Sequence, residues 1–238
     1  MNPSLIFYPQ LFRTIWINSR KAKKNNYDGA DWADSSRDVM RSLEDAGVRF
    51  EITGMKNIVS FAGPAVFIAN HMSSLETFVL PCLVQPIKPV TFVVKRSLVD
   101  APFFGHIMRS RDPILVGREN PREDLKAVIG KGTEKLGTGI SIIIFPQSTR
   151  STSFIPEEFN SLGIKLAARA GVPVVPVALK TDAWGTGRII KDFGPIDKTK
   201  TAYFAFGEPI TVEGRGADEH RRVIDFIQEN LAKWNREK

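Results

Sequence analysis

Short apolar runs alternate along this chain with longer segments in which apolar residues recur at helical spacing. The runs are nearly continuous rather than alternating, which is typical of strands that are covered on both faces. They predict strands at 48–52, 65–69, 90–94, 140–145, 174–179 and 202–206. The helical spacing predicts helices near 31–47, 74–84, 122–136, 157–170 and 217–236. Such alternation indicates an α/β fold, a single domain with a largely buried central β-sheet flanked by helices.

The first 47 residues form a segment apart from this pattern, followed by the main domain over residues 48–238. Bulky apolar residues near the start are interrupted by Pro9 and Arg13, and a basic cluster that includes Arg20 and Lys24 follows them directly. Two interpretations stay open: an interfacial helical anchor on an anionic membrane, or a helix packed on the protein's own core. The segment resembles neither a signal peptide nor a membrane span, because no apolar stretch approaches about 18 residues.

Charge and cysteine content narrow the classes of partner. The chain has 238 residues, and 33 Lys and Arg against 26 Asp and Glu give a net charge of +7. This excess favours an anionic partner, which could be a phosphorylated small molecule, an acidic membrane surface or nucleic acid. No recognised nucleic-acid motif is present, so we expect no nucleic-acid partner. The single cysteine, Cys82, excludes an internal disulfide and points to a reducing compartment.

The stretch "IANHMSSLETF" places a histidine and a carboxylate where a ligand would bind. His71 follows a buried run and Glu76 follows five residues later. In α/β folds the carboxyl ends of strands form the usual binding edge. A capping box between Ser73 and Glu76 explains the glutamate without any chemistry. A carboxylate beside an imidazole also holds one tautomer and leaves the second nitrogen free to accept a proton, so His71 is a candidate general base.

Two further stretches carry cations toward the ends of predicted strands. The segment from Lys95 to Arg118 is rich in basic residues and contains the aromatic pair Phe103 and Phe104. The stretch "IIIFPQSTRSTS" runs from a strand into a cluster of hydroxyl side chains around Arg150. A solvated basic face and an ordinary polar turn are the simpler explanations. Arginine and lysine also bind phosphate oxygens through charge-assisted hydrogen bonds, so these stretches are candidates for a phosphate site.

Taken together and in order, these stretches resemble the 1-acylglycerol-3-phosphate acyltransferase family, whose first motif is N-H-x4-D. The resemblance covers about residues 54–210. Asn70 and His71 with Glu76 match the first motif, and "FPQSTRS" matches the third, usually written F-P-E-G-T-R-S. The second and fourth motifs resemble residues 95–118 and "VPVVPV" at 172–177.

The resemblance implies acyl transfer without a covalent enzyme intermediate and with no cofactor or metal. His71 would act as general base on the free hydroxyl of a lysophospholipid, most directly 1-acyl-sn-glycerol 3-phosphate, to give phosphatidic acid. Glu76 would orient His71, and the acyl donor would be acyl-CoA or acyl-carrier protein. The resemblance implies that the substrate is bound by six residues, Lys95, Arg118, Gln147, Ser148, Thr149 and Arg150. With the N-terminal segment as an interfacial anchor, we expect a membrane-associated, peripheral protein on the cytoplasmic face.

Three positions depart from the family pattern. Glu76 replaces the usual Asp, Gln147 replaces Glu, and Ser148 replaces Gly. Glutamine keeps the size of the glutamate but exchanges its charge for an amide that can donate. These changes leave open another lysolipid acceptor, or a catalytically weakened lipid-binding relative. We expect no catalytic role for His106 or His220, and Trp184 could face lipid or fold back onto the core.

Overall fold

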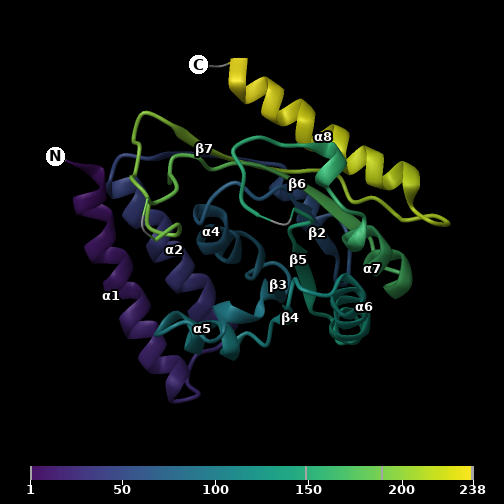
Figure 1. Cartoon of the computed structure of the whole chain (residues 1–238), viewed down its shortest axis with the longest axis horizontal. Coiled ribbons are helices and arrows are strands. Elements are labelled where there is room, and N and C mark those ends of the chain that lie inside the picture. The colour runs from purple at the N-terminus through teal and green to yellow at the C-terminus, as the bar shows by residue number, and fades with distance from the viewer. Residues whose placement is uncertain (1, 148, 189, 237–238) are drawn as a thin grey trace.

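The computed structural model describes residues 2–147, 149–188 and 190–236, and its centre is a twisted β-sheet (Figure 1). The described residues form a sheet of seven strands in the order β1-β7-β6-β2-β5-β3-β4. The strands are β1 (Arg49–Thr53), β2 (Val66–Ala69), β3 (Val90–Lys95), β4 (Ile114–Val116), β5 (Ser141–Ile144), β6 (Val174–Lys180) and β7 (Thr201–Phe206). All six predicted strands are present within one or two residues. The sequence pattern missed β4, because three residues are too few to show a period.

Five adjacent strands run in the same direction and end at one edge of the sheet. β2 pairs in parallel with β5 and β6, and β3 pairs in parallel with β5 and β4. Only β6 and β7 are antiparallel among the described pairs. The segments that follow β2, β5, β3, β4 and β6 therefore leave the sheet side by side. They include His71 and Phe145, which the sequence pattern places at strand ends, and Arg118, which follows the strand that the pattern missed.

Helices cover both faces of the sheet, as the continuous apolar runs predict. One face and its core belong to the N-terminal helices, and the other belongs to the helices after β4 (Figure 1). The first group is α1 (Pro3–Lys23), α2 (Gly29–Asp45), α3 (Met55–Val59), α4 (Leu75–Val84) and α5 (Phe104–Ser110). The second is α6 (Pro121–Gly137), α7 (Leu162–Ala170) and α8 (Ala217–Arg236). The helix predicted over 157–170 begins only at Leu162, after a 3₁₀ turn at Pro156–Glu158.

Helix α1 packs one face on the core, as the second interpretation of the N-terminal segment expects, and leaves apolar side chains exposed on the other. Phe7 and Leu11 are fully buried in the core. Leu5, Phe12 and Trp16, which lie on one side of the helix, are 70%, 50% and 51% exposed. Within the described residues, no helix has both the length and the hydropathy to cross a bilayer.

Trp184, for which the sequence left two environments open, lies in the core. It is 1% exposed and packs against the rings of Phe7 and Phe78, with centroid distances of 4.8 and 5.5 Å. The loop after β6 is therefore anchored between α1 and α4.

Candidate active site

At the common edge of the parallel strands, His71 and Glu76 are in direct contact. Nδ1 of His71 lies 2.9 Å from Oε1 of Glu76. The carboxylate is fully buried, whereas the imidazole is 13% exposed. An ionised carboxylate only accepts hydrogen bonds, so Nδ1 carries the proton and Nε2 has a free lone pair.

Hydrogen bonds hold Glu76 in its charged form inside the protein. Burial by itself raises the pKa of this carboxyl group, but the hydrogen bonds from His71, Thr181 and Ser73 outweigh it, so the pKa is lowered. Oε1 also accepts from the backbone N–H groups of Met72 (2.7 Å) and Ser73 (2.8 Å). Oε2 accepts from the hydroxyls of Ser73 and Thr181. A carboxylate with this many donors remains ionised at neutral pH.

The start of α4 explains how the sequence places this carboxylate. The predicted capping box is present only in part, because the helix begins at Leu75 and Ser74 is its N-cap. Glu76 reaches back to the N–H of Ser73, but the Ser73 hydroxyl accepts from the N–H of Leu75 instead of that of Glu76. The same carboxylate also contacts the imidazole of His71, so its part in capping does not prevent the contact that the functional interpretation requires.

The backbone of His71 is fixed by its neighbours on both sides. The side chain of Asn70 accepts from Leu179 N–H and donates to Leu179 C=O, at 2.8 Å each, which ties the end of β2 to β6. His71 N–H donates to Oε1 of Gln147 at 2.7 Å, and His71 C=O accepts from Ser151 N–H at 2.9 Å. The imidazole stacks on the ring of Phe145, with centroids 4.3 Å apart.

Arg150, one of the two arginines of the candidate phosphate site, contacts the segment between His71 and Glu76. The guanidinium of Arg150 donates to the hydroxyl of Ser74 and to the carboxylate of Asp192. Burial lowers the pKa of Arg118, the charge of Asp124 raises it, and the positive charge of Arg150 lowers it again. The effect of the Arg150 charge on Arg118 indicates that the two side chains face a common region.

A strained turn presents Arg118 to this region. Arg118 has a positive φ of 66°, which costs a residue with a side chain about 1–2 kcal/mol. Both carboxylate oxygens of Asp124 stabilise the turn by accepting from the N–H groups of Gly117 and Arg118, at 2.8 Å each. Strain held in place by a neighbour at a sheet edge is common at binding sites.

The other predicted substrate-binding residues are less engaged. Lys95 is exposed at the end of β3, in register with Val116 of β4, and therefore near the turn of Arg118. Thr149 is exposed in the loop before Arg150. Gln147 is buried and bonded to the His71 backbone, as described above. Ser148 lies outside the described residues.

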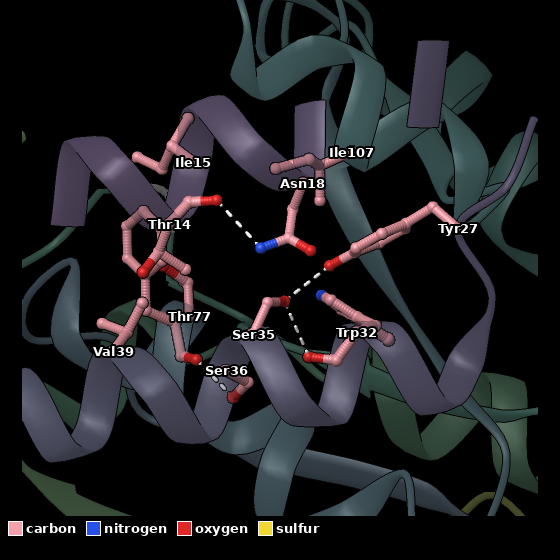
Figure 2. Close-up of a pocket in the computed structure, with 11 residues that line it drawn as sticks. Thr14, Ile15, Asn18, Tyr27, Trp32, Ser35, Ser36, Val39, Thr77 and Ile107 are labelled. Carbon is pink, nitrogen blue, oxygen red and sulfur yellow. Dashed lines mark hydrogen bonds between the residues drawn. The ribbon is translucent and has the colours of Figure 1, made fainter. Parts of the chain in front are cut away.

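Two cavities differ enough in size for only one to admit a substrate. A cavity between α1 and α2, lined by Asn18, Tyr27 and Ser35, has a volume of about 30 Å³ and matches a single water molecule (Figure 2). A cleft of about 460 Å³ opens beside Arg118, on the α6 and α7 face of the sheet edge. It is lined by Val93, Val116, Arg118, Pro121, Asp124, Leu125, Ile144, Phe145, Pro146, Gln147, Asn160, Ser161, Leu162 and Lys165.

Comparison with known proteins decides the family. The sequence model of the family described as Acyltransferase matches residues 49–180, more than half of the chain. The chain belongs to the acyltransferase family. It is 31% identical over 191 residues to 1-acyl-sn-glycerol-3-phosphate acyltransferase of Pseudomonas aeruginosa, which covers 79% of this chain and 70% of that protein.

Two more acyltransferase relatives agree with this assignment. The 1-acyl-sn-glycerol-3-phosphate acyltransferase of Escherichia coli K12 is 32% identical over 119 residues, which are 50% of this chain and 48% of that protein. The crystal structure of the 1-acyl-sn-glycerophosphate acyltransferase PlsC from Thermotoga maritima superposes with a TM-score of 0.69 at 19% identity. It covers 97% of this chain and 94% of that chain, so the two proteins share the fold.

Sequence reasoning missed several members of this acyltransferase's site. Thr181 follows β6 and lies 105 positions from Glu76, whose carboxylate it binds. Asp192, the partner of Arg150, and Lys165, in the cleft, also lie outside the recognised motifs. The pattern of "VPVVPV" predicts a strand whose end would reach this edge, but nothing in the local sequence distinguishes Thr181 from its neighbours.

Proposed function

We propose that this protein transfers a fatty acyl group from an acyl thioester to the free hydroxyl of a lysophospholipid, most directly 1-acyl-sn-glycerol 3-phosphate. The observation that carries the proposal is the contact of His71 with a buried, charged Glu76, with Arg150 bonded to Ser74 between them. The printed names of the relatives from P. aeruginosa and E. coli support the same acceptor. The product would be phosphatidic acid.

The proposed reaction uses the free nitrogen of His71. Nε2 takes the proton of the acceptor hydroxyl while the hydroxyl oxygen bonds to the thioester carbonyl carbon. Collapse of the tetrahedral intermediate breaks the carbon–sulfur bond, and the imidazolium returns the proton to the leaving thiolate. Glu76 stabilises the transient positive charge on the imidazole. Base catalysis of this kind contributes roughly 10²–10⁴-fold.

The cleft suits an acceptor that has both a phosphate and an acyl chain. Its wall is apolar where Val93, Ile144 and Leu162 line it, and cationic at Arg118 and Lys165. Arg118 and Arg150 would bind the phosphate through charge-assisted hydrogen bonds, with Lys95 at the rim. The donor is acyl-CoA or acyl-carrier protein, both of which supply a thioester that is already activated, so the proposed reaction involves no cofactor.

The exposed side of α1 supports a peripheral position on a membrane. Phe12 packs against Phe193 of the loop after β6 at a centroid distance of 5.5 Å, and Phe193 is 39% exposed. We define the apolar patch as Leu5, Phe12, Trp16 and Phe193. Arg20 and other basic residues of the last turn of α1 lie beside it, as expected for binding to anionic lipid on the cytoplasmic face.

The acyl transfer is tested by release of free thiol. Acyl-CoA and acyl-carrier protein donors are offered in turn with lysophosphatidic acid, other lysophospholipids and glycerol 3-phosphate. We expect release that depends on one class of lysophospholipid, lost in His71→Ala and kept in His220→Ala, whose imidazole stacks on Phe159. If the wild type releases no thiol with any combination of donor and acceptor but binds vesicles, the protein is a lipid-binding relative instead.

The membrane contact is tested separately by sedimentation with anionic vesicles. Replacing Leu5, Phe12 and Trp16 by Ser should reduce the bound fraction without unfolding, because all three are exposed. Phe7 is unsuitable for this test, since it is fully buried. Unchanged binding of the triple variant would contradict a role for α1 in membrane contact.

A further inference from the structure

Thr181 binds the segment 72–76 through every polar atom it has. It is fully buried just beyond the end of β6. Its N–H donates to Sδ of Met72 at 3.3 Å, and its C=O accepts from the Ser73 hydroxyl at 2.9 Å. Its own hydroxyl donates to Oε2 of Glu76. The carboxyl end of β6 is therefore bonded to the segment that carries the His71–Glu76 pair.

The two oxygens of Glu76 have different kinds of partners. Oε1 accepts from His71 Nδ1 and from two backbone N–H groups, whereas Oε2 accepts only from hydroxyls. The Ser73 hydroxyl has one proton and three acceptors within 3.0 Å, namely Oε2 of Glu76 and both oxygens of Thr181. Thr181 Oγ1 is within hydrogen-bond distance of the Ser73 hydroxyl and of Oε2 of Glu76, and the charged oxygen is the stronger acceptor. Thr181 is therefore the dedicated donor to Oε2.

We propose that Thr181 is a positioning residue of the acyl-transfer reaction, which holds the carboxylate of Glu76 in the orientation and the charged state that His71 needs. This inference rests on the proposed function. Binding at Oε2 fixes the rotation of the carboxylate about its terminal bond, so that Oε1 faces Nδ1. Hydrogen bonding also favours the ionised form over the protonated one.

The charged neighbours of Thr181 do not act on the carboxylate directly. Lys180 points to the C=O of Trp234 at 3.5 Å, and Asp182 pairs with Lys200 at 2.7 Å. Met72, Ser73 and Thr181 are uncharged, so the titratable group that contacts Glu76 is His71. A change at Thr181 therefore alters the pH dependence through this one pair.

The contact with Thr181 explains why the longer side chain of glutamate is present at position 76. Aspartate, the usual residue of the family motif, is one methylene shorter. Without a shift of the backbone it cannot keep His71, the backbone N–H groups and Thr181 as partners at the same time. Restoring it by Glu76→Asp should therefore lower turnover in this protein. If the lost contact is the one to Thr181, adding Thr181→Val to Glu76→Asp costs little more.

The decisive experiment measures kcat, KM and the pH–rate profile of Thr181→Val and Thr181→Ser. Valine keeps the shape and removes the donor, so we expect kcat to fall about tenfold with KM within about twofold. The acid limb should move to higher pH, because the ionised carboxylate has lost a donor. Serine restores the donor and should restore both kcat and the profile. A Val variant with wild-type kcat and profile would overturn the proposal.

Controls separate this role from a loss of stability or of the proposed function. If Thr181→Val fails to fold, Thr181→Ala and Thr181→Ser form a second matched pair, since alanine and serine differ only in the hydroxyl. Equal kcat values and equal pH–rate profiles for these two variants would overturn the proposal. Thr91→Val removes another buried threonine hydroxyl, which lies away from the site and donates to Arg111 C=O at 2.8 Å. This variant should leave the pH–rate profile unchanged.

A readout without turnover covers the case in which the wild type transfers no acyl group. The NMR resonance of the His71 ring N–H reports its hydrogen bond to Glu76. It should shift in Thr181→Val and return in Thr181→Ser. An unshifted resonance would contradict the positioning role, whereas an inactive wild type with a shifted resonance would contradict only the proposed reaction.

Discussion

The two halves of this site are held in different ways. The His71–Glu76 half is buried, and its hydrogen bonds run to backbone groups and to the ends of β2, α4 and β6. The arginine half is more exposed, and Arg150 pairs with Asp192, a side chain that is 50% exposed on a loop. Under the proposed function, the groups that transfer a proton are fixed before the substrate arrives, whereas Arg150 holds a partner that a phosphate can replace.

His71→Ala should have the largest effect on the fixed half. Removing the base should lower kcat by about 10²–10⁴-fold while folding is kept, because the imidazole is partly exposed and the backbone bonds to Gln147 and Ser151 remain. The thiol-release assay measures the loss, and circular dichroism checks the fold. Turnover near that of the wild type would show that the rigid half serves structure alone.

Glu76→Gln tests whether the fixed half depends on charge. The variant should lose about 1.5–3 kcal/mol of unfolding free energy at pH 7, because the amide cannot accept from all the donors around Oε2. The folded-state pKa of Glu76 is depressed, so its contribution is present above the ordinary value of 4.5 and is lost as pH falls through the lower folded value.

The difference in unfolding free energy between wild type and Glu76→Gln should therefore shrink below about pH 4.5, as urea titrations across pH would measure. Glu158→Gln, at an exposed position, is the matched control and should show no such trend. A difference that stayed constant down to acid pH would mean that Glu76 is not charged in the folded protein.

Arg150→Ala tests the exchangeable half. Losing a charge-assisted contact to the acceptor phosphate should raise KM for the lysophospholipid about 10–100-fold, with a smaller change in kcat. Steady-state kinetics at fixed ionic strength measures it, and Arg122→Ala, on the exposed side of α6, is the control. A fall in kcat at unchanged KM would place Arg150 in the fixed half instead.

The sequence predicted the contact between His71 and Glu76 better than it predicted the other partners of the site. The His71–Glu76 contact spans five positions, so strand and helix patterns alone bring the two side chains within reach. The partners of Arg150 and Glu76 at Asp192 and Thr181 are 42 and 105 positions away. No local periodicity reports on such pairs, because they depend on which strands become neighbours in the sheet.

Asp192→Asn should have the smallest effect, and it should lower the KM that Arg150→Ala raises. Removing the carboxylate frees Arg150 from a partly exposed ion pair, which is worth only about 0.2–1 kcal/mol. The KM for a phosphate-bearing acceptor should fall by up to about fivefold, most at low salt. A KM that rises would show that Asp192 supports the bound state rather than competing with the phosphate.

The amino-acid sequence by itself determined the alternation of strands and helices, the place of His71 at a strand end and the apolar and basic character of the first helix. These follow from local periodicity and from residues a few positions apart. The order of strands, and which face of α1 is buried and which is exposed, were decided only by the tertiary structure. So were the partners that hold Glu76 and Arg150, because burial and hydrogen bonding between distant segments arise only when the sheet assembles.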